Sequence, residues 1–177
     1  MTPEHNLHLT LAFLGEIPEQ NVPAADSALH GLSIGESSGS LELGEIGAFP
    51  RNGDPRVVWI GVTSGASLVE DLHGTIVSVL EERGLPFDGK PFKPHLTVGR
   101  CTKVRRSRDR RRSTPAPPPG EQERSPGSAV SPAAAVRSMQ KSLEGVRWTV
   151  PCTEVTLYES KLTPGGAVHT IRATSKT

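Results

Sequence analysis

Residues 8–13 read HLTLAF and residues 95–100 read HLTVGR, so the tripeptide HLT opens two similar stretches far apart in the chain. In each stretch apolar residues alternate with polar ones, which is typical of a half-buried β-strand. Side chains two positions apart on a strand share a face, which puts His8 beside Thr10 and His95 beside Thr97. If the two strands are neighbours, two imidazoles and two hydroxyls converge. We interpret this convergence as a candidate active site.

The residue types in these motifs suit proton transfer around a phosphate. Histidine has an unperturbed pKa of about 6.5, so one imidazole can accept a proton near neutral pH while another donates one. Threonine hydroxyls can donate hydrogen bonds to phosphate oxygens. Neither motif contains a carboxylate. The pattern therefore favours phosphodiester chemistry over a glycosidase-type pair, and we expect no metal ligands.

The doubled H-x-T pattern resembles the 2H phosphoesterase superfamily. The strings NLHLTLAFLGE and FKPHLTVGR are similar to its branch of RNA 2′,3′-cyclic phosphodiesterases, also called 2′-5′ RNA ligases. The string VTLYESKLTPGGAVHTI resembles the closing hairpin of that branch. The resemblance covers roughly residues 3–100 and 147–173. It implies an α+β fold in which two pseudo-symmetric lobes of antiparallel sheet flank a central cleft, here expected without the family's first strand and helix.

The resemblance also implies an activity and a division of roles. The expected reaction is metal-independent hydrolysis of an RNA-terminal 2′,3′-cyclic phosphate to a 2′-phosphomonoester, with no cofactor. His95 would be the base that activates water, and His8 the acid that protonates the departing 3′ oxygen. Thr10 and Thr97 would hold the phosphoryl oxygens. The sequence by itself does not fix which histidine is the acid.

Two further candidates stand five positions after the motif histidines. By the resemblance, Arg100 would contact the phosphate or another part of the substrate; the alternative is a solvated strand end. Phe13 stands where the family has an aromatic residue that can stack on a base, and core packing is an equal alternative. The histidines outside the motifs are expected to be structural or exposed. Among them, His169 replaces a frequent tyrosine of the family, which would alter how the substrate rim is closed.

Other functions remain open on the residues alone. One is a non-catalytic module that binds RNA ends or nucleotides and lost competence with its N-terminal strand. Others are 2′-5′ RNA ligation and hydrolysis of a small cyclic nucleotide such as ADP-ribose 1″,2″-cyclic phosphate. RNA ends or cyclic nucleotides are the expected partners. A monomer is expected, although nothing in the sequence fixes the oligomeric state.

Between the two motifs the hydrophobic pattern predicts the order strand, helix, strand, strand, helix, strand. The expected helices cover residues 19–32 and 67–83, and the expected inner strands cover residues 41–50 and 57–62. A turn is expected at residues 51–55, which read RNGDP. After the second motif we expect a helix at residues 133–143 and strands around residues 148, 155–158 and 168–171.

Composition divides the chain of 177 residues into unlike parts. Residues 103–112 carry seven positive charges and one negative, and six prolines follow within residues 113–132. We predict a single bilobed domain over residues 1–177 with a disordered basic and proline-rich insertion at 102–131. That insertion is either a solvated loop or an electrostatic arm that attracts RNA phosphates. Two distant cysteines and no long apolar run predict a cytoplasmic protein without a membrane partner.

Overall fold

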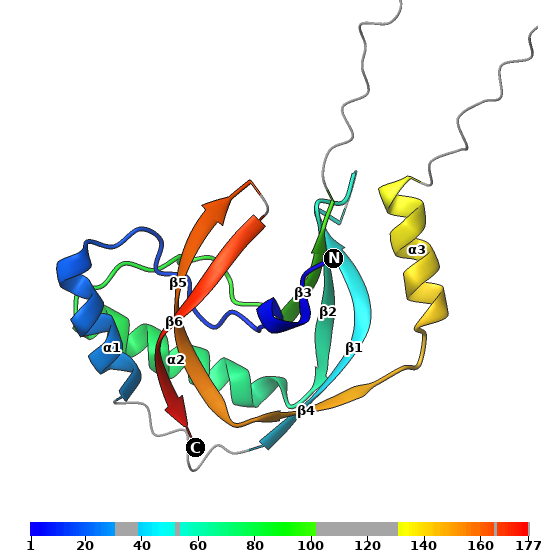
Figure 1. Cartoon of the computed structure of the whole chain (residues 1–177). Helices are drawn as coiled ribbons and strands as arrows, with labels where there is room; N and C mark the ends of the chain where they lie inside the picture. Colours follow the sequence, from blue (N-terminus) through cyan, green and yellow to red (C-terminus); the bar gives the residue numbers. More distant parts are fainter. Residues whose placement is uncertain (31–38, 52–53, 102–130, 165, 177) are drawn as a thin grey trace, which may run out of the picture.

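A computed structural model of the chain describes residues 1–30, 39–51, 54–101, 131–164 and 166–176. Two short 3₁₀ helices, three α-helices and six strands are assigned within these ranges (Figure 1). In chain order they are η1 (Glu4–Asn6), η2 (Glu19–Asn21), α1 (Val22–His30), β1 (Gly39–Phe49), β2 (Val57–Ser64), α2 (Ala66–Glu82), β3 (His95–Arg100), α3 (Pro132–Ser142), β4 (Trp148–Cys152), β5 (Glu154–Thr163) and β6 (Gly166–Lys176).

One part of the fold is a four-stranded antiparallel sheet in the order β3-β2-β1-β4. Successive side chains of a strand point to opposite faces. Ile46 of β1 and Val58 of β2 point to one face, where they are buried against Val136 of α3. Figure 1 shows α3 on the side of this sheet that faces away from β5 and β6. The other face, which carries Trp59 and His95, is therefore left for the site.

The helix α3 begins with a sequence signal that fixes its N-terminus. Ser131 precedes the helix in an extended conformation, and its hydroxyl accepts a hydrogen bond from the amide of Ala134 at 3.2 Å. Proline at position 132 starts the helix, where a missing N–H costs nothing. Val136 then points to the sheet and is buried.

The other part of the fold is the antiparallel hairpin of β5 and β6, with α1 and α2 packed against it (Figure 1). Leu29 of α1 and Leu72 of α2 form one buried cluster that also contacts Leu157 of β5. Leu80 of α2 is buried in an adjacent cluster with Ala25. The apolar face of each helix thus covers one face of the hairpin, and the opposite face of the hairpin turns toward the sheet.

The strand predicted for residues 8–13 is wrong. The structure has only an isolated antiparallel bridge there, between Leu9 and Leu96 of β3. The next backbone groups bond elsewhere, because the chain crosses from the sheet to the helical part. The carbonyl of Leu11 accepts a hydrogen bond from His73 of α2, and the carbonyl of Phe13 accepts one from the amide of Asp88. With those groups engaged, a ladder along β3 cannot continue.

The other predicted helices and strands are confirmed with shifted ends, whereas the turn predicted at residues 51–55 lies partly outside the described ranges, which omit residues 52–53. The helix expected at residues 67–83 is α2, and the strand expected at 57–62 is β2. The helix expected at 19–32 is split into η2 and α1, with residues 31–32 outside the described ranges. Apart from Ser131, the predicted insertion at 102–131 also lies outside them. Among the described residues no helix is both long enough and apolar enough to span a lipid bilayer.

Candidate active site

His95 opens β3 and is held against an aromatic platform. Its Nδ1 atom lies 2.6 Å from the carbonyl oxygen of Lys93. The imidazole meets Phe49 edge-on at 5.5 Å and Trp59 at 6.2 Å between ring centroids. The ammonium of Lys93 lies over the Trp59 ring, 5.1 Å from its centroid. The contacts with Phe49 of β1, with Trp59 of β2 and with the carbonyl of Lys93 therefore fix the orientation of His95.

His8 is held in the same way from the other side of the site. Its Nδ1 atom lies 2.9 Å from the carbonyl oxygen of Asn6. Its ring packs against the hairpin, 6.1 Å from Tyr158 and 5.0 Å from His169 between centroids. The side-chain amide of Asn6 donates to the carbonyl of Ala167 in β6 at 3.5 Å. His8 is thus joined to the hairpin through its ring and through Asn6, and to the sheet through the bridge between Leu9 and Leu96 of β3.

These contacts fix the tautomer of both histidines. A carbonyl oxygen only accepts hydrogen bonds, so Nδ1 of each ring must carry a proton, and Nε2 is left to take or give one. His73 of α2 also bonds a carbonyl through Nδ1, but its ring is stacked on Phe92 at 4.2 Å. The bond to a carbonyl is therefore not sufficient to mark a catalytic histidine. What distinguishes His8 and His95 is that both bond the carbonyl two residues earlier, on two chain segments that are paired.

The bridge between Leu9 and Leu96 relates the two motifs geometrically. In an antiparallel pair, the residues on either side of a bridged pair also face each other across the strands. Thr97 is therefore placed across from His8, and Thr10 across from His95. By alternation all four side chains turn away from the face that carries the two leucines. Thr97 is half-buried and Thr10 is exposed.

Arg100 and Phe13 differ in how closely they join this group. Arg100 ends β3 and is exposed, and its positive charge acts on His169 of the hairpin. The Phe13 side chain is 60% exposed rather than buried in a core. Among the described residues no ring contact links Phe13 to either motif histidine.

His169, which by the resemblance would alter the closure of the substrate rim, contacts the histidine of the first motif, with ring centroids 5.0 Å apart. The Nδ1 atom of His169 is 2.8 Å from the hydroxyl oxygen of Ser160, the residue opposite it in the hairpin. Burial lowers the pKa of His169 from its ordinary value of 6.5, and the charges of His8 and Arg100 lower it further. The signal for the pairing with Ser160 was present in the hairpin pattern, since the turn before residue 166 sets residues 160 and 169 opposite each other.

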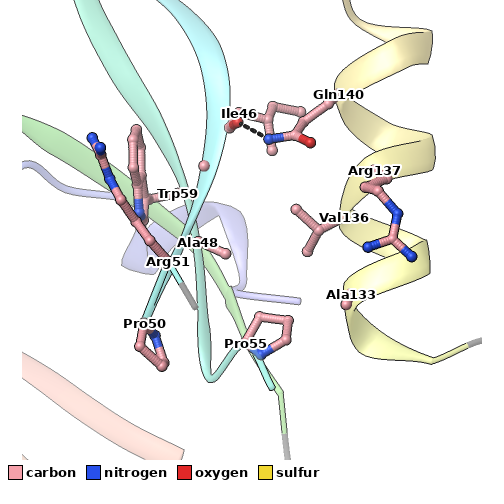
Figure 2. Close-up of a pocket in the computed structure, with 11 residues that line it drawn as sticks. Ile46, Ala48, Pro50, Arg51, Pro55, Trp59, Ala133, Val136, Arg137 and Gln140 are labelled. Atoms are coloured by element: carbon pink, nitrogen blue, oxygen red, sulfur yellow. Dashed lines mark hydrogen bonds between the residues drawn. The ribbon is translucent and has the colours of Figure 1, made fainter. Parts of the chain in front are cut away.

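A hollow with a volume of about 350 Å³ lies elsewhere, between α3 and the strands β1 and β2 (Figure 2). Figure 2 shows Val136 and Gln140 of α3 facing Ile46 and Ala48, whereas Trp59 lies on the other side of the strands. Gln140 donates to the carbonyl of Ile46 at 2.8 Å. This hollow is part of the packing of α3 and contains neither motif histidine. Within the described ranges, no three His, Cys, Asp or Glu side chains are grouped so that they could hold a metal ion.

Comparison with known proteins relates the whole chain to one family. The pattern of the 2′-5′ RNA ligase superfamily matches residues 1–121. A Thermus thermophilus protein named RNA 2′,3′-cyclic phosphodiesterase is 33% identical over 174 residues, which cover 96% of this chain and 71% of that protein. An Archaeoglobus fulgidus protein of the same name is 42% identical over 95 residues, 54% of this chain. That match spans about half of the Archaeoglobus protein, 52% of its length.

Solved structures agree with the sequence match. The crystal structure of TT0787 of Thermus thermophilus superposes with a TM-score of 0.65 at 29% identity, covering 99% of this chain and 80% of that one. The crystal structure of Escherichia coli LigT complexed with 3′-AMP gives a TM-score of 0.63 at 25% identity, covering 97% and 77%. The fold is therefore that of these two proteins, and the α+β prediction is confirmed. The chain belongs to the 2′-5′ RNA ligase superfamily.

Proposed function

We propose that this chain hydrolyses RNA-terminal 2′,3′-cyclic phosphates to 2′-phosphomonoesters without a metal ion. One observation carries the proposal, namely that two histidines make the same hydrogen bond and have the same tautomer. Nδ1 of His8 and Nδ1 of His95 each donate a hydrogen bond to the carbonyl oxygen two residues earlier. In each ring Nε2 is therefore the nitrogen that can exchange a proton with the substrate or water. The relatives named RNA 2′,3′-cyclic phosphodiesterase support the choice of substrate.

In the proposed reaction, Nε2 of neutral His95 accepts a proton from water as the water oxygen bonds to phosphorus. The bond from phosphorus to the 3′ oxygen breaks, and protonated Nε2 of His8 gives its proton to that oxygen. The 2′ ester bond is kept. Thr10 and Thr97 donate hydrogen bonds to the phosphoryl oxygens, and Arg100 adds positive charge. His8 ends neutral and His95 protonated, so proton exchange with solvent restores the starting state.

The test is hydrolysis of a 2′,3′-cyclic mononucleotide by the purified chain in excess EDTA, with the product assigned by phosphorus NMR. We expect a 2′-phosphate product. His8→Ala and His95→Ala should each lower kcat by about 10²–10⁴-fold, the usual contribution of a general acid or base. His30→Ala on α1 is the matched control, because His30 is exposed and, among the described residues, its ring bonds Asp26 of the same helix. Near-full activity of His95→Ala would overturn the proposal.

A second candidate is nucleotide binding without turnover, since related LigT structures hold 3′-AMP and ATP. Under that alternative the chain binds a cyclic nucleotide, measured by calorimetry, and releases no phosphomonoester. A third outcome, formation of a 2′-5′ linkage from RNA ends, would indicate the reverse reaction at the same histidines. Calorimetry and product analysis on one sample separate these cases.

A further inference from the structure

His169 lies in a cluster of three rings around the histidine of the first motif, His8. The rings of His8, Tyr158 and His169 form a cluster in which each contacts the other two. The centroids of His8 and His169 are 5.0 Å apart at an interplanar angle of 73°, an edge-on contact. Tyr158 lies 6.1 Å from His8 and 5.9 Å from His169. Two of the three rings belong to the hairpin, so the hairpin supports one side of His8.

His169 is anchored within the hairpin. Ser160 lies opposite it in the register of β5 and β6, and the Ser160 hydroxyl is 2.8 Å from Nδ1 of His169. On the neighbouring position of β5, Glu159 pairs with Lys161 at 3.1 Å and with Arg172 at 2.6 Å. The Glu159–Arg172 pair links β5 to β6 beside the Ser160–His169 contact, whereas the Glu159–Lys161 pair lies within β5. The hairpin therefore holds the His169 ring in the position from which it contacts His8.

The charges around His169 favour its neutral form. Burial is the largest cause that lowers the pKa of His169, followed by the charge of His8 and then that of Arg100. Tyr158 is the other titratable group that meets the ring. The carboxylate of Glu159 is engaged by its two cationic partners. A neutral His169 beside a protonated His8 avoids the repulsion that two imidazolium rings at 5.0 Å would have.

We propose that His169 is a positioning residue. Ser160 holds the His169 ring edge-on against the His8 ring. This contact limits rotation of the His8 ring away from its hydrogen bond to the Asn6 carbonyl. The inference rests on the proposed function, in which Nε2 of His8 must meet the departing 3′ oxygen. Small misplacements of a reacting group cost up to about 10²-fold in rate. His169 acts through His8 and needs no contact with the substrate.

The first test is a double-mutant cycle on kcat for a 2′,3′-cyclic mononucleotide. His169→Phe keeps a ring but loses the Ser160 anchor, and Ser160→Ala removes the anchor alone. Each should lower kcat by about 5- to 50-fold with KM changed less than about twofold, and the double variant should be no worse than the poorer single one. His30→Phe on α1 is the matched control and should keep wild-type kcat. Additive losses, or single variants with kcat within twofold of wild type, would overturn the inference.

The second test does not depend on turnover. The Nδ1 proton of His8, hydrogen-bonded to the Asn6 carbonyl, is followed by proton NMR, and its exchange with water is measured. Exchange should accelerate in His169→Phe and Ser160→Ala and stay unchanged in His30→Phe. An unchanged rate in the first two overturns the inference even if the chain proves inactive. Loss of activity in His95→Ala alone, with both hairpin variants unaffected, would keep the proposed function and discard the role of His169.

Discussion

The indole ring of Trp59 fills the space beside Gly47 in which any other residue would carry its Cβ. The two residues face each other across β1 and β2. Trp59 is 8% exposed and forms the platform on which His95 rests. A glycine in the middle of a strand weakens the strand. Here it permits an aromatic ring to lie flat on the backbone and support a catalytic candidate.

Gly47→Ala should therefore destabilise the chain and impair the site. The added Cβ would overlap the Trp59 ring, so the ring must move, and overpacking of this kind costs about 1–3 kcal/mol. We expect a lower urea midpoint and a reduced kcat, because His95 loses its support. Gly74→Ala on α2 is the matched control, since among the described residues no atom outside its chain neighbours and the nearby backbone of its own helix lies within 4 Å of its Cβ position. It should be neutral or stabilise by up to about 1 kcal/mol. Equal stability of Gly47→Ala and wild type would contradict this account.

Thr97→Val tests the hydroxyl of the second motif without disturbing β3. Valine has nearly the same shape and favours strands, so the fold should be retained. If the hydroxyl donates to the phosphoryl oxygen in the transition state, kcat should fall by about 10²–10³-fold. Thr170→Val on the exposed part of β6 is the control and should retain wild-type kcat. A Thr97→Val enzyme that works within twofold of wild type would remove Thr97 from the proposed machinery.

The sequence predicted the regular elements well because their apolar spacing is local information. In α2 the buried residues Val69, Leu72 and Leu80 recur at the spacing of one helix face, and the helix was predicted to within one residue at each end. The second motif formed a strand as expected, because β2 supplies a partner along its length. The first motif has the same alternation and forms only one bridge.

The failures of prediction share a physical cause, which is competition from distant partners. Residues after Leu9 give their carbonyls to α2 and to Asp88, and no local pattern announces those bonds. The ring contact of His169 also depends on a partner far away in the chain, since its neighbour His8 lies near the N-terminus. The pairing of the two motifs could be predicted, because the tripeptide HLT occurs in both of them. The hairpin pattern sets residue 169 opposite residue 160, but it does not show that the His169 ring meets His8.

The stability of the chain should fall faster on acidification in wild type than in His169→Phe. The folded pKa of His169 lies below its ordinary value of 6.5, so the unfolded chain binds this proton more readily. Its contribution to stability is therefore complete above pH 6.5 and is lost as the pH falls through the lower, folded pKa. Melting temperatures from pH 8 to pH 5 would show the effect. Identical slopes in the two proteins would mean that His169 titrates as an exposed histidine does.

A last pair of variants separates packing from exposure in residues of the same type. Leu80 of α2 is 3% exposed and packs with Ala25 and Leu85, whereas Leu162 near the hairpin tip is 90% exposed. Leu80→Ala should lower the free energy of unfolding by about 2–5 kcal/mol, because it removes buried methyl groups and leaves a cavity. Leu162→Ala should change it by less than about 0.5 kcal/mol.

Urea unfolding followed by circular dichroism measures both changes under one condition. If Leu162→Ala proved as costly as Leu80→Ala, the hairpin tip would have to be buried in solution by a contact that the isolated chain lacks. If Leu80→Ala were harmless, α2 would not hold the hairpin face on which Tyr158 and His169 depend. We expect Leu80→Ala to be the costly change, because the core supports the histidine cluster through β5. In that strand Leu157 packs against the cluster of Leu80, and Tyr158 contacts His8.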